Sequence, residues 1–442
     1  MCGSREVPSL LPSFDPICRS NVPGTGYLAS GDPNHKAHGA GHCPQANCTA
    51  HGHRSQHSWT RSSPCFRSKG NKHEYCVFTD STFAENRGTT LVTTAERAAY
   101  LERIPAYTDP SVTKGINQDI IRTKPAKYKV EKIEGKGLGV IATGFINRGE
   151  LIMANTVSLM FDYAAYENLE RDDYLDIQAQ AVDSLPEAHR RLILDMSTHD
   201  EGNFTYLELV EKITSTNAFD VDPDDDDVDQ DNKFYVIFPE IARMNHDCRP
   251  AADYYFDLET LTQYVHAVRP IYPGEEITVT YIDPTMRQAA RAHKLHDTWG
   301  FRCACPSCTA SRPAIAASDD RLRQIEELRP EFNKFRSASR ATPQMAELLV
   351  SLYEQERLWG MMDEAYRYAA VEWNAVGEPW TATKYARLAI EHGIYLSGEK
   401  DGDVADMDEL AADPWSHWSW MMRMKGRTGW KGRKGVAGDD ED

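Results

Sequence analysis

Three closely spaced cysteines constrain this chain more than any other feature: Cys303, Cys305 and Cys308 follow one another as Cys-x-Cys-x-x-Cys. Tetrahedral zinc takes four soft ligands, and this cluster supplies three of them. Cys248 is the only other cysteine after residue 76, so we predict that it is the fourth ligand. Three cysteines without a ligand fit this spacing less well. A zinc ion held in this way would join the segment around residue 248 to the segment around residue 305.

The bulk composition limits the classes of function. The chain has 442 residues, more than one typical domain, and 41% of them are hydrophobic, enough for real cores. Its net charge of −18 argues against a direct nucleic-acid binder, which needs clustered Lys and Arg. The charge fits a soluble protein, and it could also steer a basic protein partner toward the chain. No apolar run is long enough for a membrane span.

The N-terminal region has little hydrophobic periodicity. Residues 1–76 are rich in Gly, Pro, Ser, His and Cys, so we expect a low-order segment. This segment contains Cys43, Cys48, Cys65 and Cys76, for which three interpretations are open. They could form a small zinc site, belong to an unstructured tail, or oxidise if the segment enters an oxidising compartment. The start lacks the apolar core of a signal peptide, so we expect a nuclear or cytoplasmic protein, not a secreted one. Residues 77–127 are expected to form a linker with one short helix at 91–104, capped at Thr94.

The middle of the chain alternates in the manner of short strands. Such patterns occur at residues 128–133, 137–141, 151–153, 234–238, 252–256 and 263–268. Helical periodicity over 163–215 separates the first three from the last three, which predicts a helical insertion at 161–232. The acidic run within 220–231 is interpreted as a hydrated loop, which could also attract a basic substrate. These patterns predict an α+β fold with a mostly antiparallel, irregular sheet.

The C-terminal third is predicted to be helical. Residues 316–397 carry a diluted tetratricopeptide-like (TPR-like) pattern, and a plain antiparallel bundle is the alternative. Residues 398–442 are acidic, Gly-rich and Trp-rich, so we expect a disordered tail. The basic stretch at 423–434 suggests a nuclear import signal or, more simply, a charged flexible end.

Asn245 and His246 are candidate ligand-binding residues, because amide and imidazole groups hydrogen-bond the amino, carboxylate and adenine groups of a nucleotide-like cofactor. Alternatively, Cys248 and His246 could form the nucleophile and base of a cysteine hydrolase. A zinc-bound thiolate is committed to the metal and cannot act as a nucleophile, so the zinc-ligand interpretation of Cys248 is favoured over the hydrolase interpretation.

Tyr281 is expected to end a strand with Ile277 and Val279 on one face. A buried tyrosine there needs a hydrogen-bond partner, and an ordinary core tyrosine is the alternative.

Five motifs in this order resemble the SET-domain protein lysine methyltransferases. They are Gly135-Lys136-Gly137-Leu138, Ile146-x-x-Gly149-Glu150, Phe238-Pro-x-x-Ala242-Arg243-x-Asn245-His246-x-Cys248-x-Pro250, Gly274-Glu-Glu-Ile-x-x-x-Tyr281 and the three later cysteines. The resemblance covers residues 128–308. The helical region that follows is similar to the SMYD-type branch, and the segment Tyr75–Phe83 resembles fungal SMYD-like proteins. No segment aligns with the MYND module of that branch.

The resemblance implies a SET domain at 128–285 with a threaded (pseudoknot) segment, and a post-SET zinc segment at 286–312. It implies S-adenosyl-L-methionine as the cofactor, bound by Gly135, Lys136, Gly137, Leu138, Asn245 and His246, with Phe301 closing the adjoining channel. Tyr281 would be the catalytic residue that orients the lysine amine. Structural Zn²⁺ would be held by Cys248, Cys303, Cys305 and Cys308. The implied partner is a protein substrate with an exposed lysine, histone or non-histone; the helical domain could bind further proteins.

Two residues depart from the family pattern. Asp247 stands where the family usually has Ser, and Ala251 stands where it often has Asn. The change at Ala251 would remove a hydrogen bond that braces the turn. A catalytically silent SET scaffold that binds protein partners is therefore the alternative to an active methyltransferase.

Overall fold

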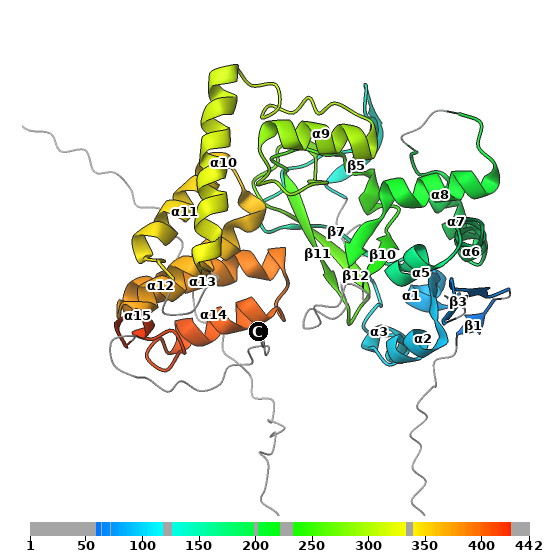
Figure 1. Cartoon of the computed structure of the whole chain (residues 1–442), viewed down its shortest axis with the longest axis horizontal. Helices are drawn as coiled ribbons and strands as arrows, with labels where there is room; N and C mark the ends of the chain where they lie inside the picture. The colour runs from blue at the N-terminus through cyan, green and yellow to red at the C-terminus, as the bar shows by residue number, and fades with distance from the viewer. Residues whose placement is uncertain are drawn as a thin grey trace, which may run out of the picture. The chain divides into compact units, whose positions relative to one another are not determined.

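The computed structural model describes residues 59–62, 64–70, 72–117, 126–198, 202–221, 233–332 and 339–425. Cys43, Cys48, most of the acidic run and the basic stretch from residue 426 lie outside these ranges, so the predictions about them stay predictions. The described chain combines helices with short, mostly antiparallel strands, as the predicted α+β class requires (Figure 1). In these ranges no helix is both long enough and apolar enough to cross a membrane.

The largest sheet joins strands from the N-terminal region to strands at the edges of the predicted insertion and to one strand within it. Its order is β1 (Thr60–Arg61), β3 (Glu74–Asp80), β4 (Thr89–Thr94), β8 (Leu159–Asp162), β10 (Phe234–Ile237) and β9 (Phe219–Val221), and β2 (Phe66–Arg67) also pairs with β3. All pairs are antiparallel except β4 with β8. Residues 60–80 and 89–94, expected as low-order segment and linker, therefore contribute strands. Their β-branched and aromatic residues are buried against the helices, which favours strand over loop.

Two further sheets have three strands each. One has the order β11 (Ala252–Asp257), β12 (Thr262–Ala267), β7 (Leu151–Thr156), and the other has the order β13 (Glu276–Ile277), β6 (Gly137–Ala142), β5 (Tyr128–Ile133). The short antiparallel strands predicted here are confirmed. The strand predicted to reach Tyr281 is wrong, because β13 ends at Ile277. Ile277, Thr278 and Val279 are all buried, so the faces do not alternate as a half-exposed strand requires.

Helices lie between these strands along the chain. They are α1 (Phe83–Asn86), α2 (Ala95–Leu101), α3 (Pro105–Thr108), α5 (Tyr163–Asn168), α6 (Arg171–Asp183), α7 (Glu187–Leu194), α8 (Tyr206–Asn217) and the 3-10 turn η2 (Ile241–Arg243). The helix expected at 91–104 begins only at Ala95, because residues 89–94 form β4. Thr94 caps it as predicted, accepting the N–H of Arg97. Helices α5 to α8 lie within the predicted insertion, and β9 follows them.

The C-terminal helices are α9 (Gln288–Trp299), α10 (Arg312–Phe332), α11 (Pro343–Glu356), η3 (Trp359–Met361), α12 (Met362–Ala375), α13 (Pro379–Leu396), α14 (Gly402–Ala412) and α15 (Met422–Lys425). From α10 to α14 they pack against one another (Figure 1), whereas Leu295 of α9 packs with Cys248 and Cys305. The disordered tail predicted from residue 398 is wrong up to residue 425. Asp401 caps α14, and the helix buries Val404, Met407 and Leu410, an apolar set that the acidic composition concealed.

Cys65 and Cys76 are joined by a disulfide. The bond links β3 to the segment just before β2. A disulfide and a shared zinc ion are mutually exclusive at these sulfurs, so in this structure the pair is oxidised rather than available to a metal.

Candidate functional site

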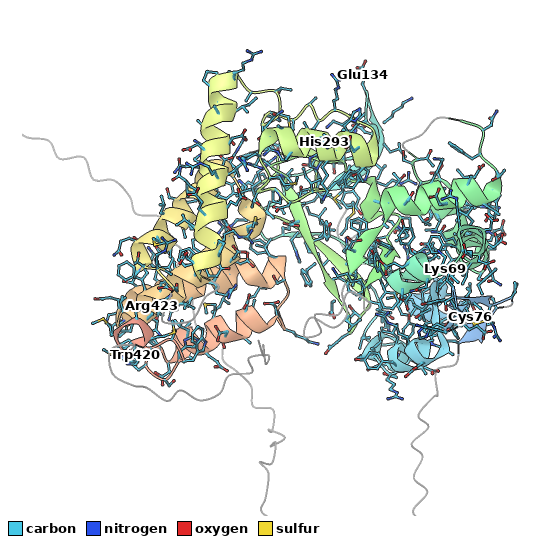
Figure 2. All side chains as sticks on the ribbon, viewed as in Figure 1. Lys69, Cys76, Glu134, His293, Trp420 and Arg423 are labelled. Atoms are coloured by element: carbon cyan, nitrogen blue, oxygen red, sulfur yellow. A yellow bond between two sulfur atoms is a disulfide. The ribbon has the colours of Figure 1, made fainter. Side chains whose placement is uncertain are left out.

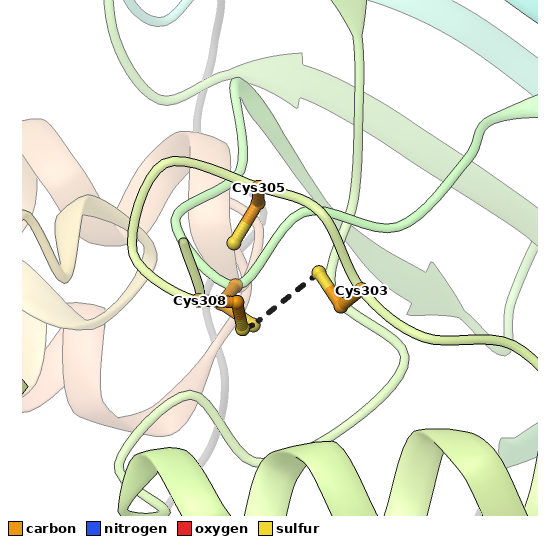
Figure 3. A group of neighbouring side chains, drawn as sticks. Cys303, Cys305 and Cys308 are labelled. Carbon is orange, nitrogen blue, oxygen red and sulfur yellow. Dashed lines mark hydrogen bonds between the residues drawn. The ribbon is translucent and has the colours of Figure 1, made fainter. Parts of the chain in front are cut away.

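Four cysteine sulfurs meet where the chain returns after α9. Gly300 ends α9 in the left-handed conformation (φ 72°), and the following loop carries Cys303, Cys305 and Cys308 (Figure 3). These three Sγ atoms and that of the buried Cys248 lie within 4.8 Å of one another. Tetrahedral zinc with bonds of about 2.3 Å separates its sulfurs by about 3.8 Å, so the four cysteines could hold zinc. The cluster therefore joins the two segments that the sequence spacing predicted.

A cavity of about 850 Å³ lies beside the cysteine cluster. Every residue that the sequence proposed for cofactor binding or catalysis borders it: Gly135, Lys136, Gly137, Leu138, Asn245, His246, Tyr281 and Phe301. Cys303 and Cys305 form part of the same wall. The structure thus brings residues more than 160 positions apart in the sequence to one cavity.

The glycine turn between β5 and β6 forms one edge of the cavity. Gly135 and Gly137 have φ of 74° and 78°, a left-handed backbone that favours glycine. A Cβ on Gly137 would meet no atom within 4 Å, so the backbone there borders open space. Gly139 differs: its Cβ would lie 2.2 Å from Cδ1 of Ile133 and 2.7 Å from Nδ2 of Asn245. Glycine at 139 therefore makes room for Asn245.

Asn245 is held against this turn by its amide group. Its Nδ2 donates to the Leu138 carbonyl at 3.1 Å and to Oε1 of Glu276 at 2.9 Å. The second carboxylate oxygen of Glu276 accepts from Nζ of Lys136 at 2.6 Å. Because both Nδ2 hydrogens are directed at protein acceptors, the Asn245 side chain can serve a ligand chiefly as an acceptor through its Oδ1.

His246 faces both the cysteine cluster and Tyr281. The N–H of Tyr281 donates to Nδ1 of His246 at 3.0 Å, and Nε2 lies 3.3 Å from Sγ of Cys248. Since Nδ1 accepts, a neutral imidazole carries its proton on Nε2 and donates it toward the sulfur. Burial lowers the pKa of His246 to about 4, which keeps the ring neutral. A hydrolase base would need an unprotonated Nε2 facing the thiol, so this geometry opposes the cysteine-hydrolase alternative.

Tyr281 borders the cavity among other aromatic rings. Its hydroxyl donates to the carbonyl of Met244 at 2.7 Å, and burial raises its pKa, so the phenol stays protonated. The ring centroid of Trp299 is 5.4 Å from that of Tyr281. The centroid of Phe301 is 6.2 Å from that of His246.

Several residues that the sequence motifs did not identify as site residues also border the cavity. Among them are Trp299, Arg243 and, from the helical insertion, Asp195, Met196, Ser197, Thr216 and Asn217. Nε1 of Trp299 donates to the Thr216 carbonyl at 3.3 Å, which ties the end of α9 to the end of α8. Arg243 stands inside a motif and could have been found there. The insertion residues reach the cavity through tertiary contacts for which the sequence carries no local signal.

At Ala251, main-chain hydrogen bonds replace the side-chain hydrogen bond that an asparagine would make. The N–H groups of Ala251 and Ala252 donate to the carbonyl of Thr278 at 3.2 and 3.0 Å. Asp247 and Val279 are bonded through their main chains as well. The turn is therefore braced against residues 278–279 by backbone bonds, without an asparagine at position 251. Threading of this segment stays a prediction.

Part of this chain matches a family model and several known proteins. The family model described as "SET domain" matches residues 137–282. N-lysine methyltransferase SMYD2-B of Danio rerio is 34% identical over 110 residues, 25% of this chain and 24% of that protein. Histone-lysine N-methyltransferase set5 of Schizosaccharomyces pombe is 30% identical over 199 residues, 45% of this chain and 56% of that protein. The chain thus spans between a quarter and about half of these curated relatives.

Among solved structures, the SET domain of LSMT bound to lysine and AdoHcy matches 72% of this chain and 91% of that chain. The TM-score is 0.29 and the identity 12%, too low to support an inference. The sequence relatives and the family model together show that this chain carries a SET domain and is similar to the SMYD2 and Set5 lysine methyltransferases.

Proposed function

We propose that this protein transfers a methyl group from S-adenosyl-L-methionine to the side-chain amine of a lysine in a protein substrate. One observation carries the proposal: the glycine turn, Asn245, Tyr281 and two of the four clustered cysteines, Cys303 and Cys305, all border a single cavity. The names of the two curated relatives, both lysine methyltransferases, support the same reaction class.

The proposed cofactor supplies an activated methyl group on a sulfonium. Gly135, Lys136, Gly137 and Leu138 would hold it along the open backbone of the turn, and Asn245 would accept a hydrogen bond from its amino group through Oδ1. Structural zinc on Cys248, Cys303, Cys305 and Cys308 would keep the loop with Phe301 against the cavity. His246 would support the metal by donating to the Cys248 sulfur.

Tyr281 would orient the substrate amine. A free lysine has a pKa of about 10.4, so the amine must lose a proton before it can attack. Burial of the amine among Tyr281, Trp299 and Phe301, near the positive sulfonium, would disfavour a second positive charge and so lower that pKa. The Tyr281 proton is donated to Met244, so its oxygen can accept an N–H from the neutral amine. That bond would leave the amine lone pair available for in-line attack on the methyl group.

The proposed substrate is a lysine of a basic protein, histone or non-histone, since the net charge of −18 favours approach of a positive partner. A nuclear or cytoplasmic location is part of the same proposal.

The test is methyl transfer from labelled S-adenosylmethionine into proteins of a cell lysate. We expect labelled lysine with the wild type. Tyr281→Phe should keep cofactor binding and lose about 10- to 100-fold in transfer, the cost of one hydrogen bond to a reacting group. Tyr100→Phe, at a tyrosine that is 52% exposed on α2, is the matched control and should behave as wild type.

Three results would contradict the proposal. A wild-type protein that binds no cofactor excludes the reaction. Cofactor binding without transfer, unchanged in Tyr281→Phe, indicates the silent scaffold instead. If the Cys305→Ser variant binds the cofactor fully and transfers methyl groups at the wild-type rate, the role given to the cysteine cluster is contradicted.

A further inference from the structure

Arg249 directly follows the cluster cysteine Cys248 and is itself buried, with 4% of its side chain exposed. Its Nη1 donates to two main-chain carbonyls, that of Cys248 at 2.6 Å and that of Pro284 at 2.9 Å. Pro284 lies in the loop that leaves Tyr281. One guanidinium therefore joins the turn that carries a cluster cysteine to the loop that follows the proposed catalytic tyrosine.

The other end of this guanidinium is held by the C-terminal helices. Nη2 of Arg249 donates to Oε2 of Glu356, the last residue of α11, at 2.7 Å. The same carboxylate accepts from Oγ of Ser318 and Nε of Arg321 on α10, each at 2.6 Å. Burial opposes the charge on Glu356, but the three hydrogen bonds hold the pKa of its carboxyl below the ordinary value. The carboxylate is therefore ionised at neutral pH.

A buried ion pair of this kind is a poor device for stability alone. Removing two charges from water costs free energy that their attraction repays only in part, and apolar residues often replace such pairs without loss. A fixed, fully hydrogen-bonded guanidinium does, however, hold its acceptors in one geometry. Here the acceptors are the Cys248 and Pro284 carbonyls, and the anchor belongs to two helices outside the SET-domain match.

We infer that Arg249 and Glu356 are a positioning pair through which helices α10 and α11 set the geometry of the cysteine cluster and of Tyr281. The C-terminal helices then hold the metal turn in the form that retains zinc and orients the tyrosine. The part of this inference that concerns methyl transfer rests on the proposed function, whereas the part that concerns zinc retention does not.

The test compares two buried ion pairs of the same helical region. Glu356→Gln breaks the proposed pair, and Glu372→Gln breaks the pair of Glu372 with Arg423 (labelled in Figure 2), whose hydrogen bonds are 2.5 and 3.0 Å long. Glu372 lies on α12 with 1% of its side chain exposed, and neither member of that pair borders the cavity. Both substitutions should lower the melting temperature, which makes Glu372→Gln a matched control for stability.

The distinguishing readouts are the rate of zinc release to a chromogenic chelator and the kcat for transfer at saturating cofactor and substrate. We expect Glu356→Gln and Arg249→Met to release zinc about tenfold faster and to lower kcat about tenfold, with Glu372→Gln at wild-type values. Arg249→Lys, which keeps the charge but cannot bridge both carbonyls in the same way, should remain impaired. The double variant Arg249→Met with Glu356→Gln should be no worse than either single one.

Equal zinc release in Glu356→Gln, Glu372→Gln and wild type would overturn the inference. Faster zinc release or a lower kcat in Arg249→Met but not in Glu356→Gln would also overturn the inference, because the helices would then not act through the pair. A wild-type protein without zinc would contradict it too. If the wild type transfers no methyl group, the proposed function fails, and the zinc-release comparison still decides the inference.

Discussion

The main-chain N–H of Tyr281 donates a hydrogen bond to Nδ1 of His246, so the proposed catalytic tyrosine and the cysteine cluster share one imidazole. The acceptor role of Nδ1 puts the ring proton on Nε2, which points toward the Cys248 sulfur. His246 thus connects the part of the site that would orient the amine with the part that would hold the metal.

His246→Phe removes both hydrogen bonds and keeps an aromatic ring. Loss of the N–H donor to the Cys248 thiolate should weaken zinc binding about 10- to 100-fold, as substitutions behind metal ligands commonly do. Competition with a chelator of known affinity measures the change. His392→Phe is the control, since His392 is equally buried but bonds Tyr395 within α13. Equal zinc affinity in the two variants would show that His246 does not support the cluster.

Gly139 leaves no room for a side chain between Ile133 and Asn245. Gly139→Ala would place a methyl group against both, so we expect a loss of about 1–3 kcal/mol in the free energy of unfolding. Displacement of Asn245 should also weaken binding of S-adenosylmethionine, measured by calorimetry. Gly144→Ala is the control, because its Cβ would come no closer than 3.4 Å to Lys127. Cofactor affinity that is unchanged in Gly139→Ala would remove Asn245 from the cofactor site.

His189 should make the fold sensitive to mild acid. Its Nδ1 donates to the Arg87 carbonyl and its Nε2 accepts from Ser158, so it is buried in the neutral form. Burial, followed by the charge of Arg87, lowers its pKa to about 4. The folded-state pKa lies below the ordinary value of about 6.5, so this contribution is fully present above pH 6.5 and is lost as the pH falls toward 4.

The loss amounts to at most about 3 kcal/mol across that window. His189→Gln cannot take up a proton, so its free energy of unfolding should fall less between pH 6.5 and pH 4.5 than that of the wild type. Denaturant unfolding at both pH values measures the difference. Parallel pH profiles for the two proteins would mean that His189 is not held neutral.

The separate pieces of this site could be predicted from the sequence more readily than their surroundings. Residue type and spacing were sufficient to predict Cys248 as the partner of the later cysteines. The glycine turn and the Asn245-His246 pair were assigned through the order of several motifs that resemble one family, because each motif alone is a weak signal. The strand expected to end at Tyr281 failed because complete burial of residues 277–279 removes the alternation on which such a prediction depends.

Other features depend on tertiary contacts. Thr216 and Asn217 reach the cavity only because α8 ends beside Trp299, and the Arg249–Glu356 pair joins residues 107 positions apart. The helix α14 was hidden by its acidic composition, although its apolar residues recur at helical spacing. The acidic composition is an average over all residues of α14, whereas only the apolar face of the helix is buried.

If the cysteine cluster and the cofactor cavity are one site, removal of zinc should change the affinity for S-adenosylmethionine. Measuring this affinity before and after zinc removal tests that relationship directly. Calorimetry would be performed on wild-type protein, on protein stripped by a chelator and shown by circular dichroism to remain folded, and on the same protein after zinc is restored. We predict that binding is lost on stripping and returns with zinc, because the loop carrying Phe301, Cys303 and Cys305 forms a wall of the cavity. A folded, zinc-free protein that binds the cofactor with wild-type affinity would contradict it.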